Sequence, residues 1–155
     1  MYFDRRRVLA MSVAIPAQAF ATTALALSRE VWSAAQAHEA LLEDRVRLLD
    51  IRSREEWRET GVAQGAWLVS MHERQFPERL FATRQLAEDR TVALICATGG
   101  RSGAVMQALR QAGHAGFVDV SEGMLGNRLG PGWIATGLPV VTMSEALALL
   151  PAALL

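Results

Sequence analysis

The stretch from Val92 to Ala112 reads VALICATGGRSGAVMQALRQA, and it combines the features of a buried strand, a tight loop and a helix. Residues 92–95 are all apolar, which is typical of a central parallel strand that is covered on both faces. Apolar residues recur at helical spacing after the loop, and Gly113 can end that helix. We therefore expect a strand–loop–helix unit, with Cys96, the only cysteine, where the strand ends.

The loop Ala97-Thr98-Gly99-Gly100-Arg101 places two glycines and a cation directly after Cys96. Glycine can adopt positive φ, so the loop amides can turn inward. Ser102 can cap the helix that follows, and a helix N-terminus favours negative charge. These groups together would favour a thiolate at Cys96. The simpler interpretation is a small buried hydrophobic residue at a strand end, but the surrounding loop favours a nucleophile.

Alternating strand-like and helix-like segments predict one α/β domain, with a parallel sheet flanked by helices on both faces. The carboxyl ends of its strands, Cys96 included, would then lie along one edge, where such sheets bind ligands. The expected segments are a first helix over 28–42 with Ser28 as its cap, strands over 46–51, 67–69 and 117–120, helices over 53–59 and 77–86, and short apolar helices at 133–136 and 146–150. In the 77–86 helix we expect Leu80, Phe81 and Leu86 to cover the sheet. The glycine-rich segment 122–131 is expected to be a loop that passes near Cys96.

Three stretches resemble the rhodanese-like sulfurtransferase family. Residues 96–102, CATGGRS, resemble its active-site loop. Residues 48–52, LLDIR, followed by Glu55-Glu56-Trp57, resemble its Asp-x-Arg strand and the helix after it. The C-terminal part of the resemblance consists of Val118-Asp119-Val120, Glu122-Gly123-Met124, Gly132-Trp133 and Gly137-Leu138-Pro139-Val140. The resemblance covers about residues 30 to 141, and it implies a single rhodanese-like domain.

The resemblance implies that Cys96 takes the outer sulfur of thiosulfate or a related donor and passes it from a persulfide to a thiol or cyanide. The amides of residues 97–102 would hold the anionic persulfide, and Arg101 would attract a small anionic donor. The scheme needs no metal and no organic cofactor. Asp50 and Arg52 would either support the cysteine loop or form a local ion pair at the strand end, and both interpretations stay open.

Two departures from the family pattern affect details. Residues 61–66 read GVAQGA, where the family usually has Gly-His-Ile-Pro-Gly-Ala, so the geometry of that turn can differ. Ala97 stands where the family often has a basic residue, which leaves the sulfur donor open.

Two other functions compete with sulfur transfer. A cysteine phosphatase or arsenate-type enzyme usually has five residues between Cys and Arg and a His before the Cys, whereas Ile95 precedes Cys96 here and the loop is one residue shorter. A non-catalytic rhodanese-like module would bind a protein partner, but such modules tend to lose the cysteine. A protein thiol as sulfur acceptor combines binding with the same chemistry.

The composition of the chain excludes several further kinds of chemistry and partner. The chain has 155 residues and a formal net charge of zero, which suits one domain and argues against nucleic acid as a partner. It contains no lysine, so a lysine Schiff base is excluded, and its single cysteine excludes an internal disulfide. His38, His72 and His114 have no metal-ligand spacing and are interpreted as surface or supporting residues.

The N-terminal residues 1–26 have the pattern of a signal peptide. Arg5-Arg6-Arg7 precedes a mildly apolar, uncharged run over 8–20, and the arginines resemble a twin-arginine export signal. Sec export and an uncleaved anchor are the alternatives. We expect a bacterial periplasmic protein with a domain over 27–141. The apolar tail 142–155 is expected to pack on this domain rather than to contact a partner or a membrane.

Overall fold

The computed structural model describes residues 31–155, so the predicted signal peptide over 1–26 and the predicted cap Ser28 lie outside the described residues. In chain order the elements are β1 (Val31–Trp32), α2 (Ala34–Leu42), β2 (Val46–Asp50), α3 (Arg54–Thr60), β3 (Val62–Ala63), β4 (Trp67–Leu68), α4 (Phe76–Leu86), β5 (Thr91–Ile95), α5 (Gly100–Gln111), β6 (Phe117–Val120), α6 (Gly132–Ala135), β7 (Val140–Val141), α7 (Met143–Ala148) and the 3-10 helix η1 (Ala152–Leu154).

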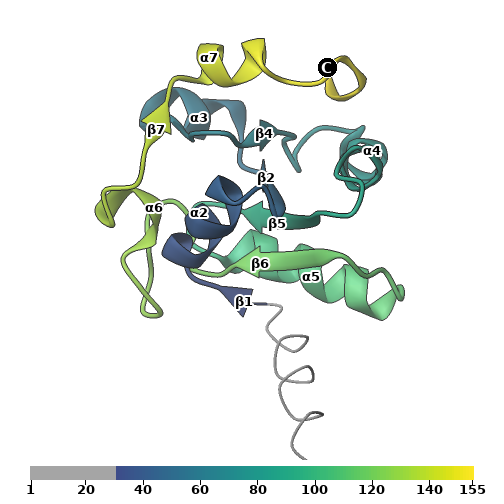
Figure 1. Ribbon diagram of the computed structural model, residues 1–155, viewed down its shortest axis with the longest axis horizontal. Coiled ribbons are helices and arrows are strands. Elements are labelled where there is room, and N and C mark those ends of the chain that lie inside the picture. The colour runs from purple at the N-terminus through teal and green to yellow at the C-terminus, as the bar shows by residue number, and fades with distance from the viewer. Residues whose placement is uncertain (1–30) are drawn as a thin grey trace, which may run out of the picture.

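The main sheet is parallel throughout and has the strand order β1-β6-β5-β2-β4 (Figure 1). The predicted strand before Cys96 is β5, and it lies in the middle of the sheet between β6 and β2. The α/β fold with a central parallel sheet is therefore confirmed. A second, two-stranded sheet pairs β3 with β7 in antiparallel orientation, and the sequence did not predict β7 as a strand.

Helices cover both faces of the sheet, as predicted, because the side chains of β5 alternate between two cores. Ala93 and Ile95 pack into one core with residues of α2, α3, α6 and α7. Val92, Leu94 and Cys96 pack into the other core with residues of α4, α5 and η1. All five residues are fully buried, which explains the continuous apolar run of this strand.

The strand pairing brings the Asp50–Arg52 segment to the same sheet edge as Cys96. Asp50, the last residue of β2, pairs with Ile95, the last residue of β5. The Ile51 N–H then donates to the Ile95 carbonyl at 3.0 Å, which continues the pairing one step further. Cys96 therefore begins the connection at the carboxyl edge of the sheet, where the topology predicted it.

The first helix begins later than predicted. It starts at Ala34, and Ser33 is its cap, because the Ser33 side chain accepts from the Gln36 N–H while the Gln36 side chain accepts from the Ser33 N–H. Residues 31 and 32 pair with β6 instead of entering the helix. Pairing with a strand that is distant in the sequence overrides the local helical pattern.

Helix α4 covers the sheet with fewer residues than predicted. Leu80 is 4% exposed, whereas Phe81 and Leu86 are 37% and 38% exposed. The buried positions of this segment are 80, 83 and 87, so the inward stripe follows the helical i, i+3, i+7 spacing from Leu80. Phe81 and Leu86 lie outside that stripe, and the prediction for these two was wrong.

The C-terminal segment packs on the domain. Helix α7 begins with the predicted capping box, in which Thr142 and Glu145 bond to each other's backbone N–H groups. Leu150 and Leu154 are buried in the core that also contains residues of α4 and α5. Figure 1 shows α7 in yellow crossing one end of the domain. The predicted packing of the tail is therefore confirmed.

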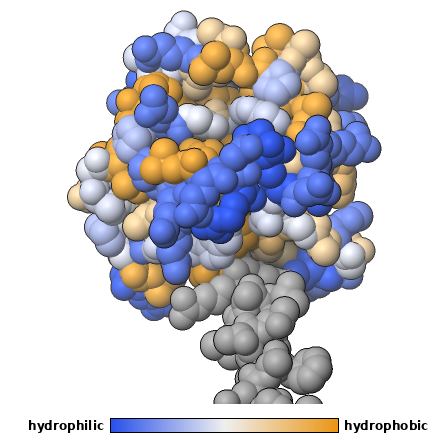
Figure 2. All heavy atoms as spheres, in the orientation of Figure 1, coloured by the Kyte–Doolittle hydropathy of each residue, from blue (hydrophilic) through white to orange (hydrophobic). Residues whose placement is uncertain are grey.

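No helix within residues 31–155 is both long enough and apolar enough to cross a bilayer. On the face seen in Figure 2, apolar side chains occupy several separate areas that are divided by hydrophilic ones.

Candidate active site

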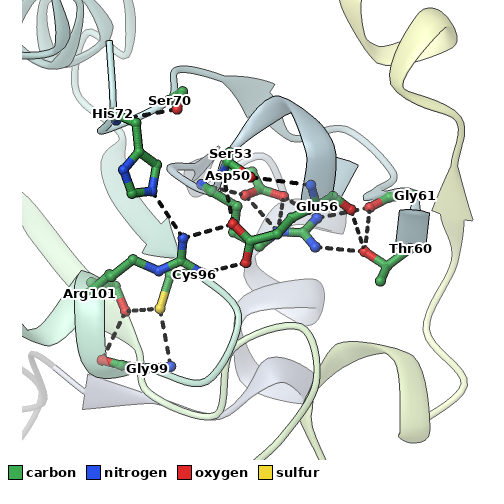
Figure 3. A network of polar contacts seen from close by, with 12 residues as sticks. Asp50, Ser53, Glu56, Thr60, Gly61, Ser70, His72, Cys96, Gly99 and Arg101 are labelled. Atoms are coloured by element: carbon green, nitrogen blue, oxygen red, sulfur yellow. Dashed lines mark hydrogen bonds and ion pairs between the residues drawn. The ribbon is translucent and has the colours of Figure 1, made fainter. Parts of the chain in front are cut away.

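Cys96 lies in a buried position between the end of β5 and the start of α5, and its side chain has no exposed surface. Two groups donate hydrogen bonds to its sulfur (Figure 3). The Gly99 N–H reaches Sγ at 3.1 Å, and the Ser102 hydroxyl oxygen lies 3.5 Å from Sγ. A sulfur that accepts two hydrogen bonds at a helix N-terminus is in a setting that favours a negative charge.

The loop is shorter than predicted, because Gly100 and Arg101 already belong to α5. The helix cap is Gly99, with φ of 83°, and not Ser102. A Cβ at Gly99 would lie 1.9 Å from the Ser121 carbonyl oxygen, so this turn requires glycine. The prediction that Ser102 caps the helix was wrong. Its hydroxyl lies in the first helical turn and contacts Cys96 Sγ and the Gly99 carbonyl, the latter at 3.3 Å.

The segment 122–131 passes beside the cysteine loop, as predicted, and three hydrogen bonds fix the two together. The N–H groups of residues 124 and 125 donate to the carbonyls of Cys96 and Ala97 at 2.9 and 2.8 Å. The Asn127 side chain donates to the Thr98 carbonyl at 2.7 Å. A Cβ at Gly123 would lie 2.4 Å from the Ala97 carbonyl oxygen, so the two segments can approach only because Gly123 has no side chain.

Sequence reasoning did not identify Asn127 as part of the site. Its side-chain amide also donates to the Ser121 carbonyl at 2.7 Å, so one residue links the cysteine loop to the end of β6. Its position in a glycine-rich segment was the only signal in the sequence.

The positive charge of Arg101 is compensated by a carboxylate rather than left free beside the cysteine loop. Its guanidinium donates to both carboxylate oxygens of Glu56 in α3, and the Nη1–Oε2 distance is 2.7 Å. Nη1 also lies 3.3 Å from Nε2 of His72, and Figure 3 marks this contact with a dashed line. The hydrogen bonds from Arg101 lower the pKa of Glu56 from its usual 4.5 to about 2. The same carboxylate raises the pKa of Arg101, so this pair stays ionised.

Asp50 and Arg52 form a fully buried ion pair at the end of β2, with 2.7 Å between Arg52 Nη2 and Asp50 Oδ2. Arg52 also donates to the Thr60 hydroxyl at 2.7 Å and to the Gly61 carbonyl at 2.8 Å. These contacts hold the end of α3. Of the two interpretations left open, the geometry therefore matches the local ion pair rather than direct support of the cysteine loop.

Asp119 is a buried carboxylate close to this site. It belongs to β6, it is 7% exposed, and its Oδ1 has no hydrogen-bond partner among the described residues. Burial raises the pKa of Asp119 above its usual 3.8, while a hydrogen bond with Ser102 and the charge of Arg110 oppose that change. The sequence placed Asp119 in a strand but assigned it no role.

The predicted site residues therefore divide into two groups. Gly99 and Ser102 contact the Cys96 sulfur, whereas no such contact is seen for Ala97 and Thr98 within residues 31–155. Gly100 and Arg101 belong to α5, where Arg101 connects to α3. The structure adds Glu56, Asn127 and Asp119. Within residues 31–155, no three His, Cys, Asp or Glu side chains are arranged to hold a metal ion.

Solved structures with this fold come from several organisms. A rhodanese-related protein from Thermoplasma volcanium is 29% identical, with a TM-score of 0.51 over 72% of this chain and 96% of that one. Rv0390 from M. tuberculosis is 28% identical, with a TM-score of 0.51 over 70% of this chain and 94% of that one. A Rhodopseudomonas palustris protein of unknown function, described as a possible tyrosine phosphatase, shares the fold at 20% identity, with a TM-score of 0.54 over 86% of this chain and 100% of that one.

A search of curated proteins finds no match to this chain. A sequence model of the family described as "Rhodanese-like domain" matches residues 33–126, which is more than half of the chain and includes Cys96, Glu56 and Asp119. The protein belongs to the rhodanese-like domain family.

Proposed function

We propose that this protein is a sulfurtransferase in which Cys96 carries a sulfane sulfur as a persulfide. The observation that carries the proposal is the pair of hydrogen bonds to Cys96 Sγ, from the Gly99 N–H and the Ser102 hydroxyl, at the start of α5. These donors stabilise Cys96 Sγ as the anionic nucleophile before the transfer, and after it the negative charge lies on the outer sulfur that Sγ has gained.

The reaction consists of two displacements. The Cys96 thiolate attacks the outer sulfur of a donor such as thiosulfate, so a new S–S bond forms while the S–S bond of thiosulfate breaks and sulfite leaves with its electron pair. The Cys96 persulfide then gives its terminal sulfur to an acceptor. Cyanide leaves as thiocyanate, or a thiolate leaves as a new persulfide, and in both cases the Cys96 thiolate is restored.

The charges around the site influence which sulfur donor can bind. Arg101 shares its charge with Glu56, and Ala97 adds no cation to the loop. Because Cys96 has no exposed surface, the covering side chains must shift before a donor sulfur can reach Sγ. We propose a small donor with an accessible sulfane sulfur, thiosulfate or a related compound, and a small or protein thiol as the acceptor.

Intact mass spectrometry of the purified protein tests this function. The wild type, treated with thiosulfate or with a low-molecular-weight persulfide, should gain the mass of one sulfur atom, and Cys96→Ala should not. Cyanide should then remove the added mass and produce thiocyanate. If no sulfane donor adds sulfur to wild-type Cys96, the proposal is wrong and the non-catalytic binding module becomes the better description.

We further propose that residues 1–26 direct export to the bacterial periplasm. The support is the arginine cluster Arg5-Arg6-Arg7 followed by an uncharged apolar run. Fractionation of expressing cells should recover a shortened chain in the periplasm, and Arg5→Gln combined with Arg6→Gln should retain the full-length chain in the cytoplasm. Recovery of full-length wild type in the cytoplasm would contradict export.

A further inference from the structure

The burial of Cys96 raises the question of where its thiol proton goes. A thiol must lose its proton to act as a nucleophile, and at an exposed site water would accept it. Neither Cys96 nor Ser102 has any exposed surface. While the site is closed in this way, the first acceptor of the proton is therefore a group of the protein itself.

Ser102 and Asp119 form a path away from the sulfur. The Ser102 hydroxyl oxygen lies 3.5 Å from Cys96 Sγ. The Asp119 carboxylate is 7% exposed, and its interaction with the same hydroxyl opposes the rise of its pKa on burial. A Cβ on Gly103, the residue after Ser102, would lie 3.7 Å from Asp119 Oδ2, so this carboxylate faces the first turn of α5.

Asp119 also has unused capacity to bind a proton. Its Oδ1 accepts no hydrogen bond among the described residues. A buried carboxylate oxygen without a partner is unfavourable while the group is ionised, and protonation removes the charge that burial penalises. We propose, on the basis of the sulfurtransferase function above, that Asp119 accepts the thiol proton of Cys96 through the hydroxyl of Ser102.

The transfer balances in charge and in atoms. The S–H bond of Cys96 breaks as its proton binds Ser102 Oγ, and the hydroxyl proton of Ser102 passes to an oxygen of Asp119. The sulfur keeps the electron pair and attacks the donor. The site begins with one carboxylate anion and one thiol, and it ends with one carboxylic acid and one anionic sulfur. A single negative charge is therefore kept within the buried region.

The surrounding charges permit this exchange. Around Asp119, Arg110 of α5 is the charged side chain that acts on the carboxylate, and the residue paired with Asp119 on β5, Leu94, is uncharged. On β1 the paired residue is Val31, which is also uncharged. Burial is the largest influence on Asp119, and it raises the pKa of this carboxyl toward the range in which it can hold a proton.

The groups that face Cys96 come from α5, α3 and the ends of neighbouring strands. The Arg101 charge acts on Cys96 and on Asp50, and Glu56 and His72 contact Arg101 on its outer side. Since Glu56 has a pKa of about 2, its ionised carboxylate does not compete for the thiol proton near neutral pH.

A purely electrostatic role for Asp119 predicts the opposite effect of its removal. If the carboxylate only repels an anionic sulfur, Asp119→Asn should make the thiolate easier to form and Cys96 more reactive. If Asp119 accepts the proton, Asp119→Asn should make Cys96 less reactive at neutral pH. The direction of change therefore separates the two roles.

The test measures the rate at which methyl methanethiosulfonate, a small uncharged thiol reagent, labels Cys96 as the pH is varied. In wild type we expect a nearly constant rate through neutral pH. Asp119→Asn and Ser102→Ala should be about a hundredfold slower at neutral pH, because a general base contributes at least that much. Their rates should rise about tenfold per pH unit as the thiolate forms without a base, so the difference from wild type should close at high pH.

Two variants serve as controls. Ser102→Thr keeps a hydroxyl at the same place and should keep the flat profile. Thr136→Ala removes a hydroxyl that bonds to the Gly132 carbonyl at 2.6 Å, away from the cysteine loop, and should match wild type. A rate for Asp119→Asn that equals or exceeds wild type across the pH range would overturn the proposal, as would normal reactivity in Ser102→Ala.

The reagent needs no sulfane donor, so the proton path and sulfur transfer can fail separately. Labelling with the predicted profile but without persulfide formation would retain the path and reject the transfer. Persulfide formation with unchanged labelling in Asp119→Asn would retain the sulfur transfer and reject the proton path. No labelling of wild-type Cys96 at any pH would overturn both.

Discussion

Arg101 at the start of α5 holds Glu56 in α3 across 45 residues of sequence, with 2.7 Å between Nη1 and Oε2. The pair connects the helix that begins at the cysteine loop to the helix that follows β2. Glu56 at the same time caps its own helix, because Oε2 accepts from the Ser53 N–H at 2.9 Å. One carboxylate therefore fixes both a helix start and the arginine beside Cys96.

We expect Glu56→Gln to lower the free energy of unfolding by about 1 kcal/mol at neutral pH, since this partly exposed pair is screened by solvent. The pKa of Glu56 falls from 4.5 to about 2 on folding, so its contribution is complete above pH 4.5 and is lost as the pH falls toward 2. Urea denaturation at several pH values should show the difference from wild type disappearing over that range. Glu55→Gln, an exposed neighbour, should show much less of this dependence.

Arg52→Met should destabilise the protein by about 3 kcal/mol or more, because it leaves the carboxylate of Asp50 buried and unpaired. Both side chains of the pair are fully buried. Arg54→Met is the matched control, since Arg54 forms a half-exposed ion pair with Glu73 and its loss should cost under about 1 kcal/mol. Equal midpoints of denaturation for the two variants would show that the buried pair contributes no more to stability than the half-exposed one.

Gly99→Ala and Gly100→Ala should behave very differently, although they are adjacent. An alanine Cβ at Gly99 would meet the Ser121 carbonyl oxygen at 1.9 Å in a backbone conformation with φ of 83°, so the loop must move. That shift removes the N–H that bonds to Cys96 Sγ and should reduce persulfide formation at least about tenfold. At Gly100 a Cβ meets nothing within 4 Å, and this variant should react like wild type. Similar rates for both would contradict the assigned role of the Gly99 amide.

Asn127→Ala should weaken the connection between the cysteine loop and the end of β6. Its side chain donates to the Thr98 and Ser121 carbonyls, each at 2.7 Å. Losing both bonds should slow sulfur transfer several-fold, about 1 kcal/mol in barrier, because the loop is held less firmly. Arg128→Ala, an exposed neighbour, should leave the rate unchanged. Steady-state kinetics with a sulfane donor would compare them, and an unaffected Asn127→Ala would show that backbone bonds alone hold the loop.

Local sequence was sufficient for the elements whose signals are local. The apolar run of β5, the capping boxes of Ser53–Glu56 and Thr142–Glu145, and the helix end at Gly113 all depend on residues within a few positions of each other. The order of strands and helices then determined the fold class and placed Cys96 at the carboxyl edge of a central strand.

Tertiary structure decided the partners of the site, because these come from segments far apart in the chain. Periodicity could not show that residues 31 and 32 would pair with β6 rather than begin a helix. It could not assign Arg101 to Glu56 or place Asn127 against the Thr98 carbonyl.

The same limit applies to Asp119, whose carboxylate gains its significance only from burial beside Ser102. The sequence by itself identified Cys96 as the candidate nucleophile and determined the strand–loop–helix unit that presents it, since both depend on neighbouring residues. The charged and polar groups around the sulfur were placed by packing, since electrostatic interactions depend on distance and burial rather than on separation along the chain.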